Sequence, residues 1–169
     1  MFTDARNDAL LEQLVLRLPR GSGIVFRHYH LRETSRRKRF ETVKKLARRR
    51  GHILFLAGSP ALARRWRADG VHGRVQRRTN MGGMPHSVPV HNALEIQQAN
   101  RVCADIYFLS PVFTTRSHPG QQPLNPLQTR RLAALCNGAV IYLGGMNEYR
   151  YRMRKNHLTH GWAAIDALS

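Results

Sequence analysis

Short, uninterrupted apolar runs recur along the chain, and amphipathic segments separate them. Continuous runs are typical of parallel strands buried on both faces, whereas strands with one solvated face alternate in polarity. Seven runs are expected to be strands, and Phe2-Thr3-Asp4 reads as the stub of an eighth. The seven expected strands cover residues 24–26, 53–57, 70–72, 88–90, 106–109, 139–143 and 162–165.

Apolar residues at helical spacing occupy most of the segments between these runs. Ser59 and Asn92 stand where helix N-caps are expected. The segment 74–87 is basic and glycine-containing and is expected to be irregular. The expected helices cover residues 9–18, 35–50, 60–66, 93–101, 127–135 and a basic stretch that ends near 157. This alternation predicts an α/β fold, and it leaves a small (βα)8 TIM barrel and an open doubly wound sheet as alternatives.

The length of 169 residues suits one domain, 1–169, with its own core. No apolar stretch is long enough to span a bilayer, and the first residues do not resemble a secretion signal. Two cysteines, Cys103 and Cys136, form neither a disulfide framework nor a CxxC metal cluster. We therefore expect a cytoplasmic protein.

The net charge is the unusual part of the composition. Lys and Arg number 28 against 10 acidic residues, a formal charge of +18. Such a chain attracts polyanions, so nucleic acid and phosphorylated small molecules are the two partner classes to consider.

The densest basic segment covers residues 32–50 and holds ten Lys or Arg against two Glu. Its apolar stripe predicts an outer helix that packs on the sheet and turns a solvated basic face outward. Nucleic-acid binding through this face is the less favoured alternative. No aromatic residues interleave with the basic ones, so such binding would be nonspecific and salt-sensitive.

Polar residues follow several of the expected strands, at the edge where parallel sheets bind ligands. The loop 110–120 carries hydroxyl groups together with Arg116 and His118, which are able to surround a phosphate. Gly144-Gly145 allows backbone N–H groups to approach an anion closely. The nine histidines lack the spacing of metal ligands, and no transition-metal site is expected.

Several blocks resemble those of the thiamine-phosphate synthase and thiazole tautomerase (TenI) family, in the family's order and at about its spacing. The resemblance extends over nearly the whole chain, and it implies a minimal TIM barrel with a curtailed first strand. The blocks are Ala68-Asp69-Gly70-Val71-His72, Val90-His91-Asn92-Ala93-Leu94-Glu95, Ala104-Asp105, the segment 110–117 and Leu143-Gly144-Gly145-Met146.

The family's synthases join hydroxymethylpyrimidine diphosphate to a thiazole phosphate and release pyrophosphate. The resemblance implies catalytic roles for Arg27, His91 and His118, the two histidines standing in for a tautomerase base whose position holds Pro111 here. It implies that phosphate and substrate bind at His28, Ser110, Thr114, Thr115, Arg116, Ser117, Gly144 and Gly145.

The family's Mg²⁺ ligands are the main departure. The Asn-Asp pair after the third strand falls at Ala57-Gly58, and a second metal Asp has no counterpart near residues 74–78. Mg²⁺ is thus expected from the family but lacks its usual ligands, and no metal-binding residue is assigned.

Because the metal carboxylates are missing, synthase activity of transferase type is expected to be reduced or absent. The alternatives are a non-catalytic binder or sensor of phosphorylated thiamine precursors and a tautomerase-like protein. A nonspecific nucleic-acid-binding protein comes last. The oligomeric state is left open.

Overall fold

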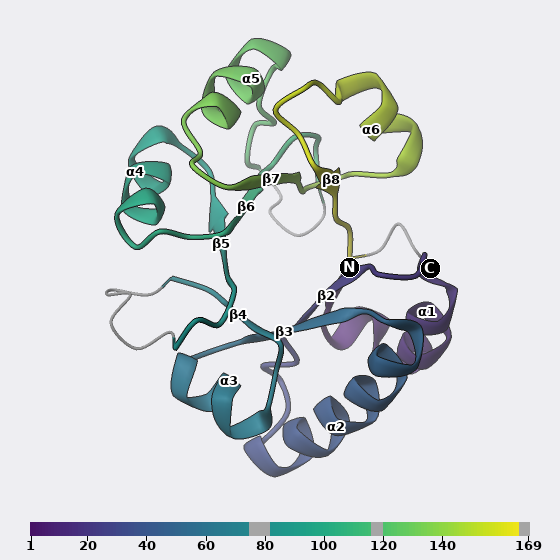
Figure 1. Ribbon diagram of the computed structural model, residues 1–169. Helices are drawn as coiled ribbons and strands as arrows, with labels where there is room; N and C mark the ends of the chain where they lie inside the picture. The colour runs from purple at the N-terminus through teal and green to yellow at the C-terminus, as the bar shows by residue number, and fades with distance from the viewer. Residues whose placement is uncertain (75–81, 116–119, 166–169) are drawn as a thin grey trace.

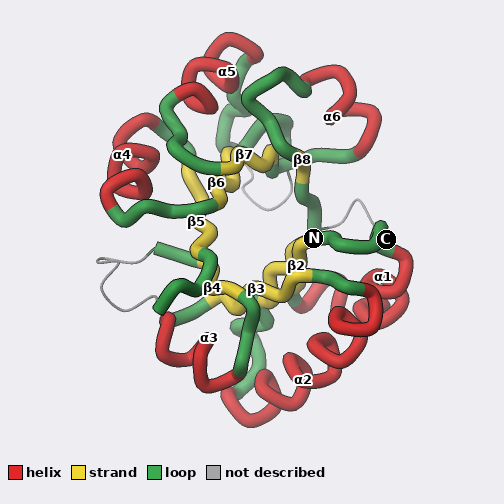
Figure 2. Tube along the Cα trace, in the orientation of Figure 1, coloured by secondary structure: helices red, strands yellow, loops and turns green. Residues whose placement is uncertain are grey.

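The computed structural model describes residues 1–74, 82–115 and 120–165 (Figure 1). Eight strands form one parallel sheet in chain order. The sheet curls into a ring, and the helices surround it (Figure 2). The strands are β1 (Phe2–Thr3), β2 (Gly23–Phe26), β3 (Ile53–Ala57), β4 (Gly70–His72), β5 (His86–Val90), β6 (Ile106–Leu109), β7 (Ala139–Tyr142) and β8 (Gly161–Trp162).

Hydrogen bonds at the first strand close the ring. The Phe2 N–H donates to the Ala164 carbonyl (3.0 Å). The Asn7 side-chain amide donates to the carbonyls of Phe2 (2.9 Å) and Ile165 (3.2 Å). The chain therefore forms a (βα)8 barrel rather than an open sheet, and β1 spans two residues.

The helices agree closely with the sequence prediction. The expected caps are confirmed: Ser59 accepts a hydrogen bond from the Leu62 N–H, and Asn92 accepts one from the Glu95 N–H. No helix in the described part of the chain is long and apolar enough to cross a membrane. The helices are the 3₁₀ helix η1 (Ala5–Leu10), α1 (Leu11–Arg17), α2 (Glu33–Arg50), α3 (Pro60–Trp66), α4 (Ala93–Arg101), α5 (Pro126–Ala134) and α6 (Glu148–Arg154).

Several boundaries differ from the prediction, and three of these differences have a clear physical cause. The first helix begins earlier, as η1, because the Asp4 carboxylate caps the Arg6 N–H. His86 and Ser87 belong to β5 rather than to an irregular segment, since the Asp105 carboxylate holds the His86 N–H. The last strand is shorter than expected, because only Gly161 and Trp162 pair with β7.

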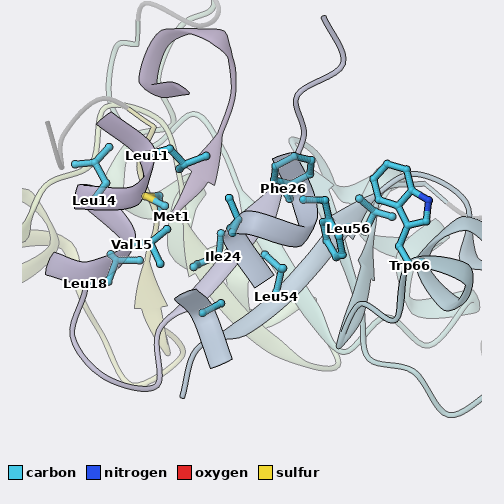
Figure 3. Close-up of a cluster of buried hydrophobic side chains, with 14 of the residues drawn as sticks. Met1, Leu11, Leu14, Val15, Leu18, Ile24, Phe26, Leu54, Leu56 and Trp66 are labelled. Atoms are coloured by element: carbon cyan, nitrogen blue, oxygen red, sulfur yellow. The ribbon is translucent and has the colours of Figure 1, made fainter. Parts of the chain in front are cut away.

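Side chains fill both faces of the sheet. The inside of the ring holds an apolar cluster that includes Phe2, Val25, Phe55 and Phe108. A second cluster lies between the sheet and the N-terminal helices (Figure 3), and a third, around Tyr107, lies under the C-terminal helices. Burial on both faces is the physical reason that the strands read as continuous apolar runs.

The basic helix α2 departs in part from the expected solvated face. Arg37 and Lys38 are exposed, but Arg36 is only 8% exposed. Its guanidinium donates to the carbonyls of Arg27 (2.7 Å) and Ala57 (2.6 Å), which joins the ends of β2 and β3. Arg39 also turns inward, toward Asp8 and Glu12. The expectation of a solvated basic face was therefore wrong for these two arginines.

Replacing Gly70 by alanine should destabilise the barrel. A Cβ on Gly70 would lie 2.3 Å from the Phe55 ring inside the barrel. Overpacking of this kind typically lowers the free energy of unfolding by about 1–3 kcal/mol, and denaturant unfolding measures it. Gly23→Ala is the matched control in a strand, because nothing lies within 4 Å of its added Cβ. Equal losses in the two variants would contradict this reading of the interior.

Candidate functional site

Arg27 provides a fixed positive charge at the carboxyl ends of the first strands. Its guanidinium donates to the Asp4 carboxylate (2.7 Å) and the Thr3 carbonyl (3.2 Å), and lies 5.4 Å from the centre of the Phe2 ring. Partial burial opposes ionisation of Asp4, but hydrogen bonds from Arg6 and the charges of Arg27 and Arg6 outweigh it, so the Asp4 pKa is lowered. The Arg27 side chain stays 26% exposed and is therefore accessible to an anion.

His28 is held within the protein. Its ring is fully buried and stacks on Phe26, with Nδ1 2.7 Å from Thr3 Oγ1 and Nε2 2.8 Å from Asp8 Oδ1. Burial lowers the pKa of His28, although the hydrogen bond and charge of the Asp8 carboxylate act to raise it. The lowered pKa favours a neutral ring. In this geometry both ring nitrogens serve the junction of β1, β2 and η1, and neither is presented to a ligand.

The loops that follow β6 and β7 lie against each other. The Val112 N–H donates to the Leu143 carbonyl and the Phe113 N–H to the Gly144 carbonyl, both at 3.0 Å. A Cβ on Gly145, which has a φ of +58°, would lie 2.4 Å from the Thr114 carbonyl oxygen. Only glycine allows this close approach.

The predicted phosphate residues are thereby partly brought together. Ser110, Thr114 and Thr115 lie on the loop that contacts Gly144 and Gly145. Within the described ranges, the N–H groups of the two glycines have no hydrogen-bond partner. The remaining predicted residues Arg116, Ser117 and His118 lie outside the described residues.

Two arginines of α6 support these loops, although the sequence analysis assigned them no site role. The Arg150 guanidinium donates to the Gly145 carbonyl and lies 4.9 Å from the centre of the Phe113 ring. Arg154 lies 5.0 Å from the same ring, and its Nη1 is buried without a hydrogen-bond partner. Arg150 and Arg154 are four residues apart on the helix that follows the glycine pair, so they are neighbours on its surface. This spacing is the sequence signal that would have indicated them.

His91 forms a dyad with a carboxylate. Its Nδ1 lies 2.8 Å from Glu95 Oε2, which also accepts the His91 backbone N–H (2.9 Å), and Arg74 donates to the other oxygen. Burial raises the Glu95 pKa, but the hydrogen bonds from His91 outweigh it, and the pKa is lowered overall. An ionised Glu95 keeps the proton on Nδ1 and thereby sets the tautomer of the His91 ring.

A cavity of about 510 Å³ borders this dyad and continues along α4. It is lined by Arg74, Val88, Pro89, Glu95, Gln98, Ala99, Arg101 and Val102.

His72 is a further polar residue inside the ring, and it was part of a family block without an assigned role. Its Nδ1 lies 3.0 Å from Ser87 Oγ, and its ring meets the edges of Phe2 (5.2 Å) and Phe108 (5.5 Å). Burial lowers its pKa to about 3, and the Arg27 charge acts in the same direction. The neutral His72 imidazole and the Arg27 guanidinium therefore both contact the Phe2 ring.

The residues present do not fit a bound Mg²⁺. At the end of β3, Ala57 has no donor side chain, and its carbonyl accepts a hydrogen bond from the Arg36 guanidinium. Asp4 and Glu95 are each held by two basic side chains. No group of three or more His, Cys, Asp or Glu in the described part of the chain could hold a metal.

The buried His72 should make stability depend on pH. Because its folded pKa of about 3 lies below the ordinary 6.5, only the unfolded state binds a proton between these values. As the pH falls from about 6.5 to about 3, the free energy of unfolding should therefore decrease by about 1.4 kcal/mol for each pH unit. His72→Asn, which does not titrate, should show a shallower slope in urea unfolding across this range. Parallel slopes for the two proteins would contradict the assignment.

Known proteins resemble this chain in sequence and in fold. The family model for thiamine monophosphate synthase matches residues 1–168. No curated protein sequence matches. Three similar solved structures are a thiamine phosphate pyrophosphorylase from Pyrococcus furiosus, another from Bacteroides thetaiotaomicron, and the YdjI aldolase from Escherichia coli K12.

The first has a TM-score of 0.79 at 17% identity, covering 97% of this chain and 83% of that chain. The second has a TM-score of 0.57 at 16% identity, covering 98% and 81%. The aldolase has a TM-score of 0.64 at 11% identity, covering 97% and 72%. At these identities the structures establish the barrel, while the family model extends over almost every residue. The chain belongs to the thiamine monophosphate synthase family.

Proposed function

We propose that the chain is a thiamine-phosphate synthase-like protein of the cytoplasm that binds phosphorylated thiamine precursors at the carboxyl ends of its strands. The reaction would join hydroxymethylpyrimidine diphosphate to thiazole phosphate and release pyrophosphate. The carbon–oxygen bond to the diphosphate breaks first, and the thiazole nitrogen then captures the pyrimidine cation.

The contact between the loops after β6 and β7 carries this proposal. The N–H groups of Gly144 and Gly145 have no partner among the described residues, and the hydroxyls of Ser110, Thr114 and Thr115 lie on the loop packed against them. Backbone amides beside hydroxyl groups form a typical phosphate site, and the loop after the seventh strand is a usual place for it in barrels. Arg150 keeps this geometry by holding the Gly145 carbonyl.

Arginines supply the remaining positive charge in the proposal. The partly exposed Arg27 lies at the barrel mouth, and Arg116 is assigned to the phosphate loop by the sequence. Guanidinium groups bind phosphate oxygens in a bidentate manner and stabilise a leaving polyanion. Since the family's metal carboxylates are replaced, we propose that ligand binding needs no divalent cation.

Titration calorimetry with thiazole phosphate and with the pyrimidine diphosphate tests this proposal. We expect binding of equal affinity in EDTA and in Mg²⁺, and an affinity about 10- to 150-fold lower for Arg116→Ala, as for the loss of a charged hydrogen bond of about 1.5–3 kcal/mol. Arg130→Ala, which removes an exposed charge on α5, is the matched control.

Formation of thiamine phosphate from the two substrates distinguishes the enzyme from a sensor. Turnover supports the synthase reaction, whereas binding without turnover supports a carrier or sensor of the same ligands. If neither substrate binds, the proposal is wrong.

The His91–Glu95 dyad favours a second candidate, a tautomerase-like protein. A histidine whose tautomer is set by a carboxylate is a typical general base. His91 would remove a proton from the bound thiazole phosphate and return it at another atom of the ring.

His91→Asn should slow proton exchange by roughly 10²–10⁴-fold, which is the usual contribution of such a base. Solvent deuterium incorporation into thiazole phosphate, followed by NMR, measures the exchange. Glu95→Gln should shift the pH profile of exchange, because it removes the charge that orients His91. Both variants should still bind the phosphate, and unchanged exchange in His91→Asn would exclude this candidate.

A further inference from the structure

The solvent side of α2 carries five basic side chains that we name the outer basic face. All five are exposed. At 100° per residue they fall within an arc of about 120°, and from first to last they span about 18 Å of the helix axis. They are Arg37, Lys38, Lys45, Arg48 and Arg49.

The acidic groups nearest to this face already have other partners. Glu41 pairs with Lys44 (2.7 Å), and Glu33 pairs with Arg65. On the side of α1, Asp8 and Glu12 are held by Arg39. Across the described residues, no acidic side chain pairs with any member of the outer basic face. Among the described residues, its five formal charges are therefore uncompensated.

The fold does not require this arrangement. Phe40, Val43 and Ala47 make the buried face of α2. Arg48 and Arg49 lie in the last turn, where the helix dipole favours positive charge, but Arg37 and Lys38 lie beyond the first turn and gain nothing from it. Lys45 faces Arg48 and Arg49 at spacings of three and four residues, where like charges repel. Because packing requires none of the five charges and Lys45 is repelled by its neighbours, an external partner of opposite charge explains the cluster better than packing does.

We propose that the outer basic face binds the phosphodiester backbone of nucleic acid without reading its sequence. Duplex DNA carries about one negative charge for every 1.7 Å of its axis, so an 18 Å face meets enough phosphates to engage all five side chains. A lipid surface is the less suitable polyanion, because a helix that lies in a bilayer inserts an apolar face. The apolar face of α2 is buried against the sheet.

This surface lies apart from the phosphate loops. Figure 1 shows α2 on the outside of the ring of strands, next to α1 and α3, whereas the loops after β6 and β7 belong to the other half of the barrel. Binding at the two places should therefore be independent, and the inference does not rest on the proposed function.

Fluorescence anisotropy with a random-sequence DNA duplex and a random RNA strand, over a salt series, tests the proposal. For five phosphate contacts, log K should fall with log salt at a slope of about −4.5 on duplex DNA. Replacing all five residues of the outer basic face by Gln should remove most of this slope and lower the affinity at least tenfold at low salt.

A matched control neutralises five other exposed basic residues, of which four lie on other helices and one directly follows α6. It carries Arg101→Gln, Arg130→Gln, Arg131→Gln, Arg152→Gln and Lys155→Gln. The slope should stay close to that of the wild type in this variant. Circular dichroism and thiazole-phosphate titration of both variants report whether the fold and the barrel mouth are intact, so failure of the proposed function would be seen separately.

Three outcomes would overturn the proposal. One is absence of binding to either nucleic acid at 50 mM salt, and another is equal loss of slope in the two variants. The third is tighter binding to vesicles rich in phosphatidylserine than to nucleic acid, with the same dependence on the five residues, which would assign the face to a membrane instead.

Discussion

Closure of the ring between its two shortest strands, β1 and β8, is the constraint on which the rest of the structure depends. β1 contributes two residues. The Phe2 N–H donates a hydrogen bond to the Ala164 carbonyl, and the Asn7 side-chain amide donates one to the Ile165 carbonyl, which joins β1 to the segment after β8. The Phe2 side chain then fills the interior, where its ring meets Phe108 at 4.7 Å and His72 at 5.2 Å. Without this closure, the Arg27 guanidinium would lose both the Phe2 ring and the Asp4 carboxylate.

Arginine side chains join the elements around the mouth of the barrel. Arg36 links the ends of β2 and β3, Arg39 links α2 to η1 and α1, and Arg150 links α6 to the loop after β7. A guanidinium has several donors in a fixed plane, so one side chain satisfies carbonyls from two segments. These buried or half-buried arginines are part of the fold, and they differ in kind from the exposed arginines of the outer basic face.

This division separates the two proposed uses of the chain's unusual positive charge. In the proposed function Arg27 suits a small phosphorylated ligand, because partial burial strengthens each charge-assisted hydrogen bond. The exposed side chains of α2 contribute little individually at physiological salt, and only a partner with many phosphates gains from all of them together.

The sequence alone determined the elements of the fold and their class. Its continuous apolar runs located β3, β4 and β6 to the residue, because burial on both faces leaves an unambiguous pattern. The caps at Ser59 and Asn92 and the loops after β6 and β7 could be predicted as well, since turn and cap chemistry is local. The choice of a closed barrel came from the order of the family blocks, because local patterns cannot show which strand edges meet.

Only the tertiary structure decided which polar side chains face a ligand and which hold the fold. The sequence placed Arg36 and Arg39 with their solvated neighbours, yet both turn inward to partners 9 to 31 residues away. His28 was predicted to bind phosphate, and it is instead enclosed by Thr3 and Asp8. His72 is positioned by contacts with Phe2 and Phe108 from other strands, and Arg150 by its contact with Phe113 from another loop. The physical reason is common to all of them: the partner of a polar side chain is set by closure of the ring, which joins segments that no local pattern connects.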